Sequence, residues 1–122
     1  MNMQHNPLRR DSYIKQALEL YRCIPGTLGR IRREDRLLAA DLHDRGISLS
    51  TLEAAFVLAA ARRCLRSPDA HPLVPIRSMH YFLPVIEEIL DNPPAPNYLA
   101  YLKSRIKQYA AVDTPSLRKT LP

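Results

Sequence analysis

Arginine side chains carry the chemistry that this sequence offers most clearly. The chain of 122 residues contains 18 lysines and arginines against 12 aspartates and glutamates, a formal net charge of +6, and most of the cations are arginines. A guanidinium group donates two parallel N–H groups to a phosphate, so it suits phosphate recognition better than an ammonium group does. The charge balance therefore favours a polyanionic partner, with nucleic acid ahead of a membrane surface.

The cations gather in three clusters along the chain. The residues that we expect to contact phosphate are Arg30, Arg32, Arg33 and Arg36 in the first cluster, Arg62, Arg63, Arg66 and Arg77 in the second, and Lys103 and Lys107 in the third. Glu34, Asp35, Asp41 and Asp44 lie along the same predicted helix and could pair with the arginines of the first cluster. The acid nearest to the second cluster along the chain is Asp69. The second cluster is therefore the stronger candidate for phosphate binding.

Residues typical of catalysis or metal binding do not form a recognisable pattern. The sequence contains no glycine-rich phosphate loop, no HEXXH pattern and no Ser-His-Asp order. Cys64, His71 and His80 follow one another at wider spacings than structural zinc ligands do. We therefore expect a binding protein without a catalytic site, a metal ion or a cofactor.

Aromatic residues offer a second way to contact nucleic acid. Tyr81, Phe82, Tyr98 and Tyr101 could stack on exposed bases. They stand beside leucines at helical spacing, however, which favours core positions with the tyrosine hydroxyls at the surface.

An apolar segment over residues 51–65 is the expected centre of the fold. Ser50 and Glu53 fit a capping box at its start, and the segment is apolar on nearly every side, which is typical of a buried helix. We expect helices over residues 12–23, 32–45, 51–65, 79–90 and 97–110. The predicted fold class is all-α, a compact orthogonal bundle of about five helices with a proline-rich loop between helices three and four.

Single residues fix several of the helix ends. Gly46 fits the left-handed position just past the end of the second helix, and Ile47 supplies the apolar contact back onto that helix. Ser78 is a good N-cap for the fourth helix. Pro84 lies inside that helix, so we expect a kink or a tight first turn there.

The chain divides into a flexible basic leader over residues 1–10, a single helical domain over 11–110 and a loose basic tail over 111–122. Apolar runs are all shorter than the roughly 20 residues that a membrane span requires, and the N-terminus lacks the apolar stretch of a secretory signal. Cys23 and Cys64 are expected to be reduced, buried thiols. These features predict a cytoplasmic protein.

A helix-turn-helix is an alternative arrangement for the second and third helices, with Gly46 in the turn. The recognition helix would then begin with residues 51–56, which offer one acid and no arginine, lysine, asparagine or glutamine to reach base edges. A helical hairpin that supports the core is therefore the preferred interpretation.

Residues 49–90 resemble the C-terminal module of the DnaD-like primosomal and phage replication proteins. The shared outline is an apolar helix (LSTLEAAFVLAAARR), a variable loop, and a second helix carrying Ser78, Tyr81, Phe82, Val85, Ile86, Ile89 and Leu90. Pro84 departs from that pattern. The resemblance implies a helical module that binds DNA near its C-terminal end and helps to load a helicase. Residues 35–56 also resemble segments of accessory proteins of plasmids and transposable elements.

The leading hypothesis is a small basic DNA-binding accessory protein, linked to replication or a mobile genetic element, that contacts phosphates without catalysis. DNA is expected ahead of RNA, together with a larger replication or transposition protein as a possible partner and no membrane. The alternative is a protein–protein interaction adaptor or a subunit of a larger nucleoprotein complex.

Overall fold

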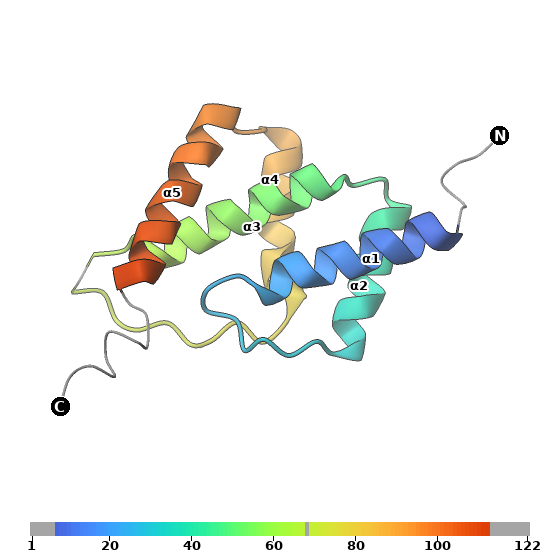
Figure 1. Cartoon of the computed structure of the whole chain (residues 1–122), viewed down its shortest axis with the longest axis horizontal. Helices are drawn as coiled ribbons and strands as arrows, with labels where there is room; N and C mark the ends of the chain where they lie inside the picture. The colour runs from blue at the N-terminus through green and yellow to red at the C-terminus, as the bar shows by residue number, and fades with distance from the viewer. Residues whose placement is uncertain (1–6, 68, 113–122) are drawn as a thin grey trace.

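A computed structural model describes residues 7–67 and 69–112 of the chain (Figure 1). Its elements are α1 (Pro7–Arg22), α2 (Arg33–Asp44), α3 (Leu49–Cys64), the short 3-10 helix η2 (Met79–Phe82), α4 (Leu83–Asp91) and α5 (Pro96–Val112). The predicted all-α bundle is confirmed. In the described part of the chain, no helix is long and apolar enough to cross a membrane.

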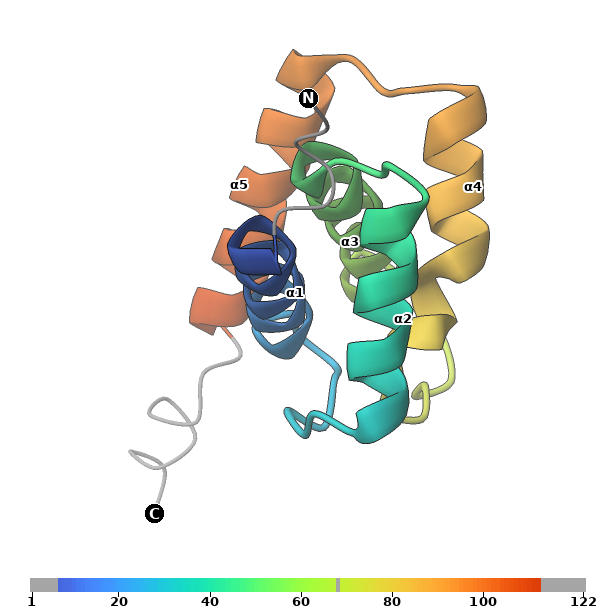
Figure 2. The ribbon, with the colours of Figure 1, turned by 90° about the vertical axis from the view of Figure 1, so that its right-hand side faces the viewer.

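Helix α3 is the centre of the bundle, and it contacts α1, α4, α5 and η2. Its buried residues are Leu52, Ala54, Ala55, Phe56, Ala59, Ala60 and Ala61. The small alanine side chains let neighbouring helices approach closely, and Phe56 fills the space against Phe82, 4.8 Å away between ring centroids. In Figure 1, α1 and α3 run across the view while α2, α4 and α5 run steeply to them, and Figure 2 shows α1 and α3 nearly end-on. The bundle is therefore orthogonal.

Two helices begin earlier than the sequence predicted because a proline starts them. α1 begins at Pro7, so residues 7–10, expected in the flexible leader, are helical. Proline is favoured at the first helical position because its missing N–H has no partner there in any case. α5 begins at Pro96 for the same reason. α5 ends at Val112, so residues 111–112, expected in the loose tail, are helical. Residues 1–6 of the predicted leader and 113–122 of the predicted tail lie outside the described residues.

Helix α3 also begins early, and the predicted capping box is wrong. Its N-cap is Ser48, whose Oγ accepts a hydrogen bond of 3.1 Å from the backbone N–H of Thr51. Glu53 binds Lys103 on α5 instead, with 3.2 Å between Nζ and Oε2. The preceding turn explains the difference, because Ile47 donates its N–H to the carbonyl of Leu42 at 3.1 Å and so brings Ser48 directly to the cap position.

The fourth predicted helix begins with a tight turn, and Pro84 lies next to that turn. The predicted single helix is the 3-10 helix η2 followed by α4, with Pro84 in the first turn of α4. Its missing N–H therefore interrupts no α-helical hydrogen bond. Ser78 caps η2 as predicted, and its Oγ accepts from the N–H of His80 at 3.1 Å.

Tyr13 on α1 carries a buried hydroxyl that has no hydrogen-bond partner among the described residues. Burial raises the pKa of Tyr13 to about 12, above its ordinary value of about 10. We expect Tyr13→Phe to leave the free energy of unfolding unchanged or to increase it by about 1 kcal/mol, because an unpaired buried hydroxyl destabilises the folded state.

The pH dependence provides the measurement. Between pH 10 and 12 the unfolded chain loses the Tyr13 proton while the folded chain keeps it, so this group makes stability fall as pH rises through that interval. Urea unfolding across this interval should therefore show a smaller decline for Tyr13→Phe than for the wild-type protein. A variant at least 1 kcal/mol less stable at pH 7 would show instead that the hydroxyl is stabilising.

Candidate nucleic-acid interface

The α1–α2 loop and the α3–η2 loop lie side by side along one edge of the bundle (Figures 1 and 2). Ile76 donates its N–H to the carbonyl of Gly26 at 2.7 Å, and Leu28 donates its N–H to the carbonyl of Ile76 at 3.1 Å. We call residues 24–36, 63–67 and 69–78 the loop edge. This pairing brings together segments that lie about fifty residues apart in sequence, and with them parts of the first and second basic clusters.

Asp35 fixes the start of α2 to the start of η2. Its carboxylate is fully buried and accepts hydrogen bonds from the N–H of Arg32 at 2.9 Å and of Met79 at 2.8 Å. The Ser78 hydroxyl donates a longer bond of 3.4 Å. A carboxylate in the first turn of a helix also interacts favourably with the helix dipole. The carboxylate thereby joins the backbone segment that carries Arg32 and Arg33 to the segment that follows Arg77.

From the sequence we did not predict that Asp35 joins two segments, and we expected it to pair with neighbouring arginines. An acidic residue three positions after the N-cap of a helix was the available signal, since its side chain can accept a hydrogen bond from the N-cap amide.

The position of Gly26 beside Arg63 was also not predicted. Its φ of +96° is favourable only for glycine, and a Cβ there would lie 3.2 Å from Nε of Arg63.

Apart from Arg63, whose guanidinium donates hydrogen bonds within the protein, six arginines of the loop edge have no ion pair within the described residues. They are Arg30, Arg32, Arg33, Arg36, Arg66 and Arg77. All are exposed except Arg66, which is half-buried. The carboxylates of this edge are Glu34 and Asp69, both exposed, and the buried Asp35. The loop edge is consequently a strip of positive charge whose guanidinium groups remain open to an anion.

Arg62 and Arg63 differ from this set, although the sequence placed them in the stronger cluster. Arg62 makes two hydrogen bonds to Glu88, of 2.9 and 2.6 Å, which lower the pKa of that carboxyl. Arg63 donates to the carbonyl of Val74 at 2.7 Å and to the Tyr81 hydroxyl at 3.3 Å, and its guanidinium lies 5.4 Å from the centroid of the Tyr81 ring. Arg63 therefore connects the α3–η2 loop to α3. Arg62 is neutralised by Glu88, which lies far from it in sequence.

The third cluster is not part of the loop edge. Lys103 is paired with Glu53 across α3 and α5. Lys107 is exposed on α5, where it lines a groove between α1, α3 and α5 that also includes Pro25. Of these two lysines, Lys107 is therefore the one without an ion pair among the described residues.

Cations at the opposite end of the bundle are neutralised. Arg10 binds Asp44 with 3.0 Å between Nη2 and Oδ2, and Arg45 binds Glu87 at 2.9 Å. The hydrogen bond from Arg10 lowers the pKa of Asp44 to about 2. Since the 12 residues of α2 span about 18 Å, this end is well separated from the loop edge. The two ends of the bundle therefore differ in charge because carboxylates lie next to the arginines at this end and not next to most arginines of the loop edge.

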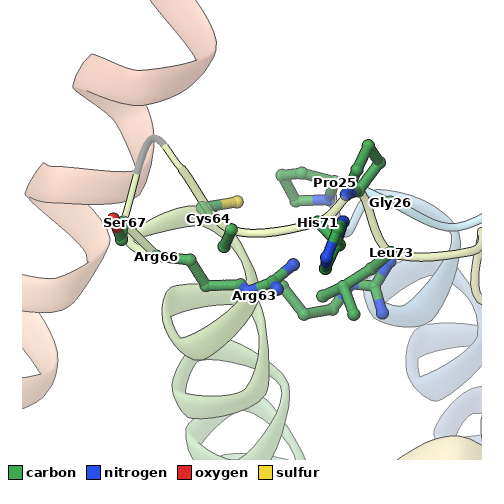
Figure 3. Close-up of a pocket in the computed structure, with 10 residues that line it drawn as sticks. Pro25, Gly26, Arg63, Cys64, Arg66, Ser67, His71 and Leu73 are labelled. Carbon is green, nitrogen blue, oxygen red and sulfur yellow. The ribbon is translucent and has the colours of Figure 1, made fainter.

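A cleft of about 520 Å³ opens between the two loops. Its lining residues are Pro25, Gly26, Arg63, Cys64, Arg66, Ser67, Ala70, His71, Pro72 and Leu73. In Figure 3 the side chains of Arg63 and Arg66 extend from the end of α3 toward His71 and Leu73, and His71 lies next to Pro25 and Gly26. The cleft thus combines cationic and apolar walls.

Other predicted features fall outside this edge. Within the described ranges, no three His, Cys, Asp or Glu side chains come together, and His80 Nδ1 lies 2.9 Å from Ser78 Oγ. In the first two turns of α3, Leu52, Ala54, Ala55 and Phe56 are buried, which argues against a recognition helix there. Cys23, expected to be buried, is exposed.

The aromatic residues divide into two groups. Phe82 is fully buried, as predicted for a core position. The prediction is wrong for Tyr98 and Tyr101, which are about half exposed and stack on each other with 6.4 Å between ring centroids. Tyr81 is also exposed and contacts Arg63. The segments that carry these residues are helical, as predicted. The burial of each tyrosine depends on which other helices pack against it, and the sequence does not give that packing.

Comparisons of the chain with models of protein families, with curated proteins and with solved structures find no match. The resemblance of residues 49–90 to the DnaD-like module therefore stays a prediction. In the structure this segment covers α3, the long loop, η2 and α4. Phe82, Ile86 and Ile89 of the shared outline are buried, so these positions serve the core.

Proposed function

We propose that the protein is a small DNA-binding accessory protein that holds the phosphate backbone along the loop edge without catalysing a reaction. One observation carries this proposal. The arginines without an ion pair are concentrated where the Gly26–Ile76 and Asp35–Met79 hydrogen bonds join two distant segments. Five of the other described cations form ion pairs with carboxylates, namely Arg10, Arg22, Arg45, Arg62 and Lys103.

Unpaired guanidinium groups favour binding to a polyanion for two reasons. No intramolecular carboxylate has to be displaced before a phosphate binds, and each phosphate contact releases counterions condensed on the DNA. Several exposed arginines on one edge can contact successive phosphates of a strand, whereas an isolated surface arginine contacts one. Binding of this kind positions the protein on nucleic acid but does not read its sequence.

The biological setting rests on the resemblance alone. A DnaD-like module would link the protein to replication, or to a plasmid or transposable element, with DNA rather than RNA as the ligand. It would also imply a larger replication or transposition protein as a partner and a cytoplasmic location.

Fluorescence anisotropy with labelled DNA over a salt series tests the proposal. We expect the logarithm of the affinity to fall linearly with the logarithm of salt concentration, with a slope of about −4 to −5 if five or so phosphates are neutralised on a duplex. Absence of binding at about 50 mM salt would contradict the proposal.

An adaptor function has one observation in its favour. Leu28, Leu73 and Val74 are exposed at the loop edge, and exposed apolar side chains beside cations also suit an acidic protein segment. A partner captured through this edge, in place of DNA and with a weak salt dependence, would favour the adaptor.

A further inference from the structure

The cleft between the two loops is lined by apolar as well as cationic residues. Pro25 and Pro72 face it from the two loops, and Leu73, which is 46% exposed, completes the apolar lining. Its volume of about 520 Å³ lies within the range typical of sites for small organic ligands, about 300–1,000 Å³. A phosphate alone would not need the apolar walls.

The polar groups of the cleft are held in place by the fold. Arg63 is fixed by Val74 and Tyr81, and the glycine at position 26 lets the loop backbone approach its guanidinium closely. Arg66 is half-buried at the cleft and has no ion pair within the described residues. Arginine planes and apolar side chains are the surfaces on which unstacked bases pack.

We infer that this cleft holds one unpaired nucleotide, so that the protein prefers single-stranded to double-stranded DNA. This inference rests on the proposed function. The base packs against Leu73 and the proline rings, its phosphate is bound by Arg66, and His71 closes the side formed by the long loop. Arg30 and Arg77, outside the cleft, hold the flanking phosphates. A base that stays paired and stacked within a duplex cannot enter such a site.

The first test compares three ligands of equal length in the same buffer: a labelled 20-nucleotide thymidine strand, the same strand with abasic sites throughout, and a 20-base-pair duplex. Anisotropy should show the thymidine strand binding at least about ten-fold more tightly than the abasic strand, because each stacked base contributes that order of affinity. The abasic strand keeps the phosphates, so this comparison isolates the base and needs no protein variant.

The second test uses the variant Leu73→Ser with His71→Ser. We expect about a ten-fold loss for the thymidine strand and an unchanged affinity for the abasic strand and the duplex. Leu90→Ser, at a similarly exposed leucine on α4 (43%), is the matched control and should bind all three ligands as the wild-type protein does. Both leucines are partly exposed, so circular dichroism should show both variants to be folded.

The outcomes separate this inference from the proposed function. Equal binding of the thymidine and abasic strands, or equal loss for all ligands in the double variant, overturns the cleft as a base site while leaving phosphate binding by the loop edge intact. Polyglutamate carries negative charges but no bases. If it displaces the strand at an equal concentration of charges, the base does not contribute to binding, and the inference is overturned. No binding of any DNA overturns both.

Discussion

Replacing Arg30, Arg33 and Arg77 with glutamine is expected to weaken duplex binding by about 100-fold at 50 mM salt. All three side chains are exposed and lack an ion pair within the described residues, and they come from both sides of the loop edge. Losing three phosphate contacts should also reduce the slope of log affinity against log salt by about three. Anisotropy titrations at four or more salt concentrations measure both quantities.

A triple variant of Arg10, Arg45 and Arg62 is the matched control, because it removes the same charge from the same residue type. Each of these arginines is paired with an exposed carboxylate: Asp44, Glu87 and Glu88, respectively. We expect less than about a five-fold loss of affinity and little change in stability, because exposed ion pairs are screened by solvent. Equal weakening in the two triple variants would show that overall charge, and not the loop edge, determines binding.

Replacing Asp35 with alanine is expected to lower the free energy of unfolding by about 2–4 kcal/mol. The substitution leaves the N–H groups of Arg32 and Met79 without their acceptor at a fully buried position. It also removes the contact that joins α2 to η2, so the two halves of the loop edge lose their alignment. Urea unfolding followed by circular dichroism at pH 7 measures the change.

Two substitutions on α2 provide the comparison. Asp41→Ala changes an exposed aspartate of the same helix and should alter stability by about 0.5 kcal/mol or less. Asp35→Asn keeps an acceptor for one of the two N–H groups, of Arg32 or Met79, and turns its amide NH2 toward the other, so it should give an intermediate loss. If Asp35→Ala proves as mild as Asp41→Ala, the buried carboxylate does not hold the two segments together.

Local rules predicted the helices and several of their ends. The apolar run of α3, the positive φ of Gly46 (78°) and the Ser78 cap depend on residues a few positions apart. Such interactions repeat wherever the same short pattern occurs, so they can be read from the sequence. The Ser50 capping box failed because Ser48 offered the same chemistry two residues earlier, and the turn through Ile47 decided between them.

The sequence by itself therefore determined the helical class, the central position of α3 and the basic character of the protein. Only the tertiary structure decided which cations remain open to a ligand. Arg62 stands 26 residues from Glu88 and Asp35 stands 44 from Met79, yet both pairs are within hydrogen-bonding distance. Electrostatic and hydrogen-bond energies depend on separation in space, which sequence distance does not give. The packing of α4 and η2 against the bundle thus neutralised Arg62 and left the arginines of the loop edge exposed.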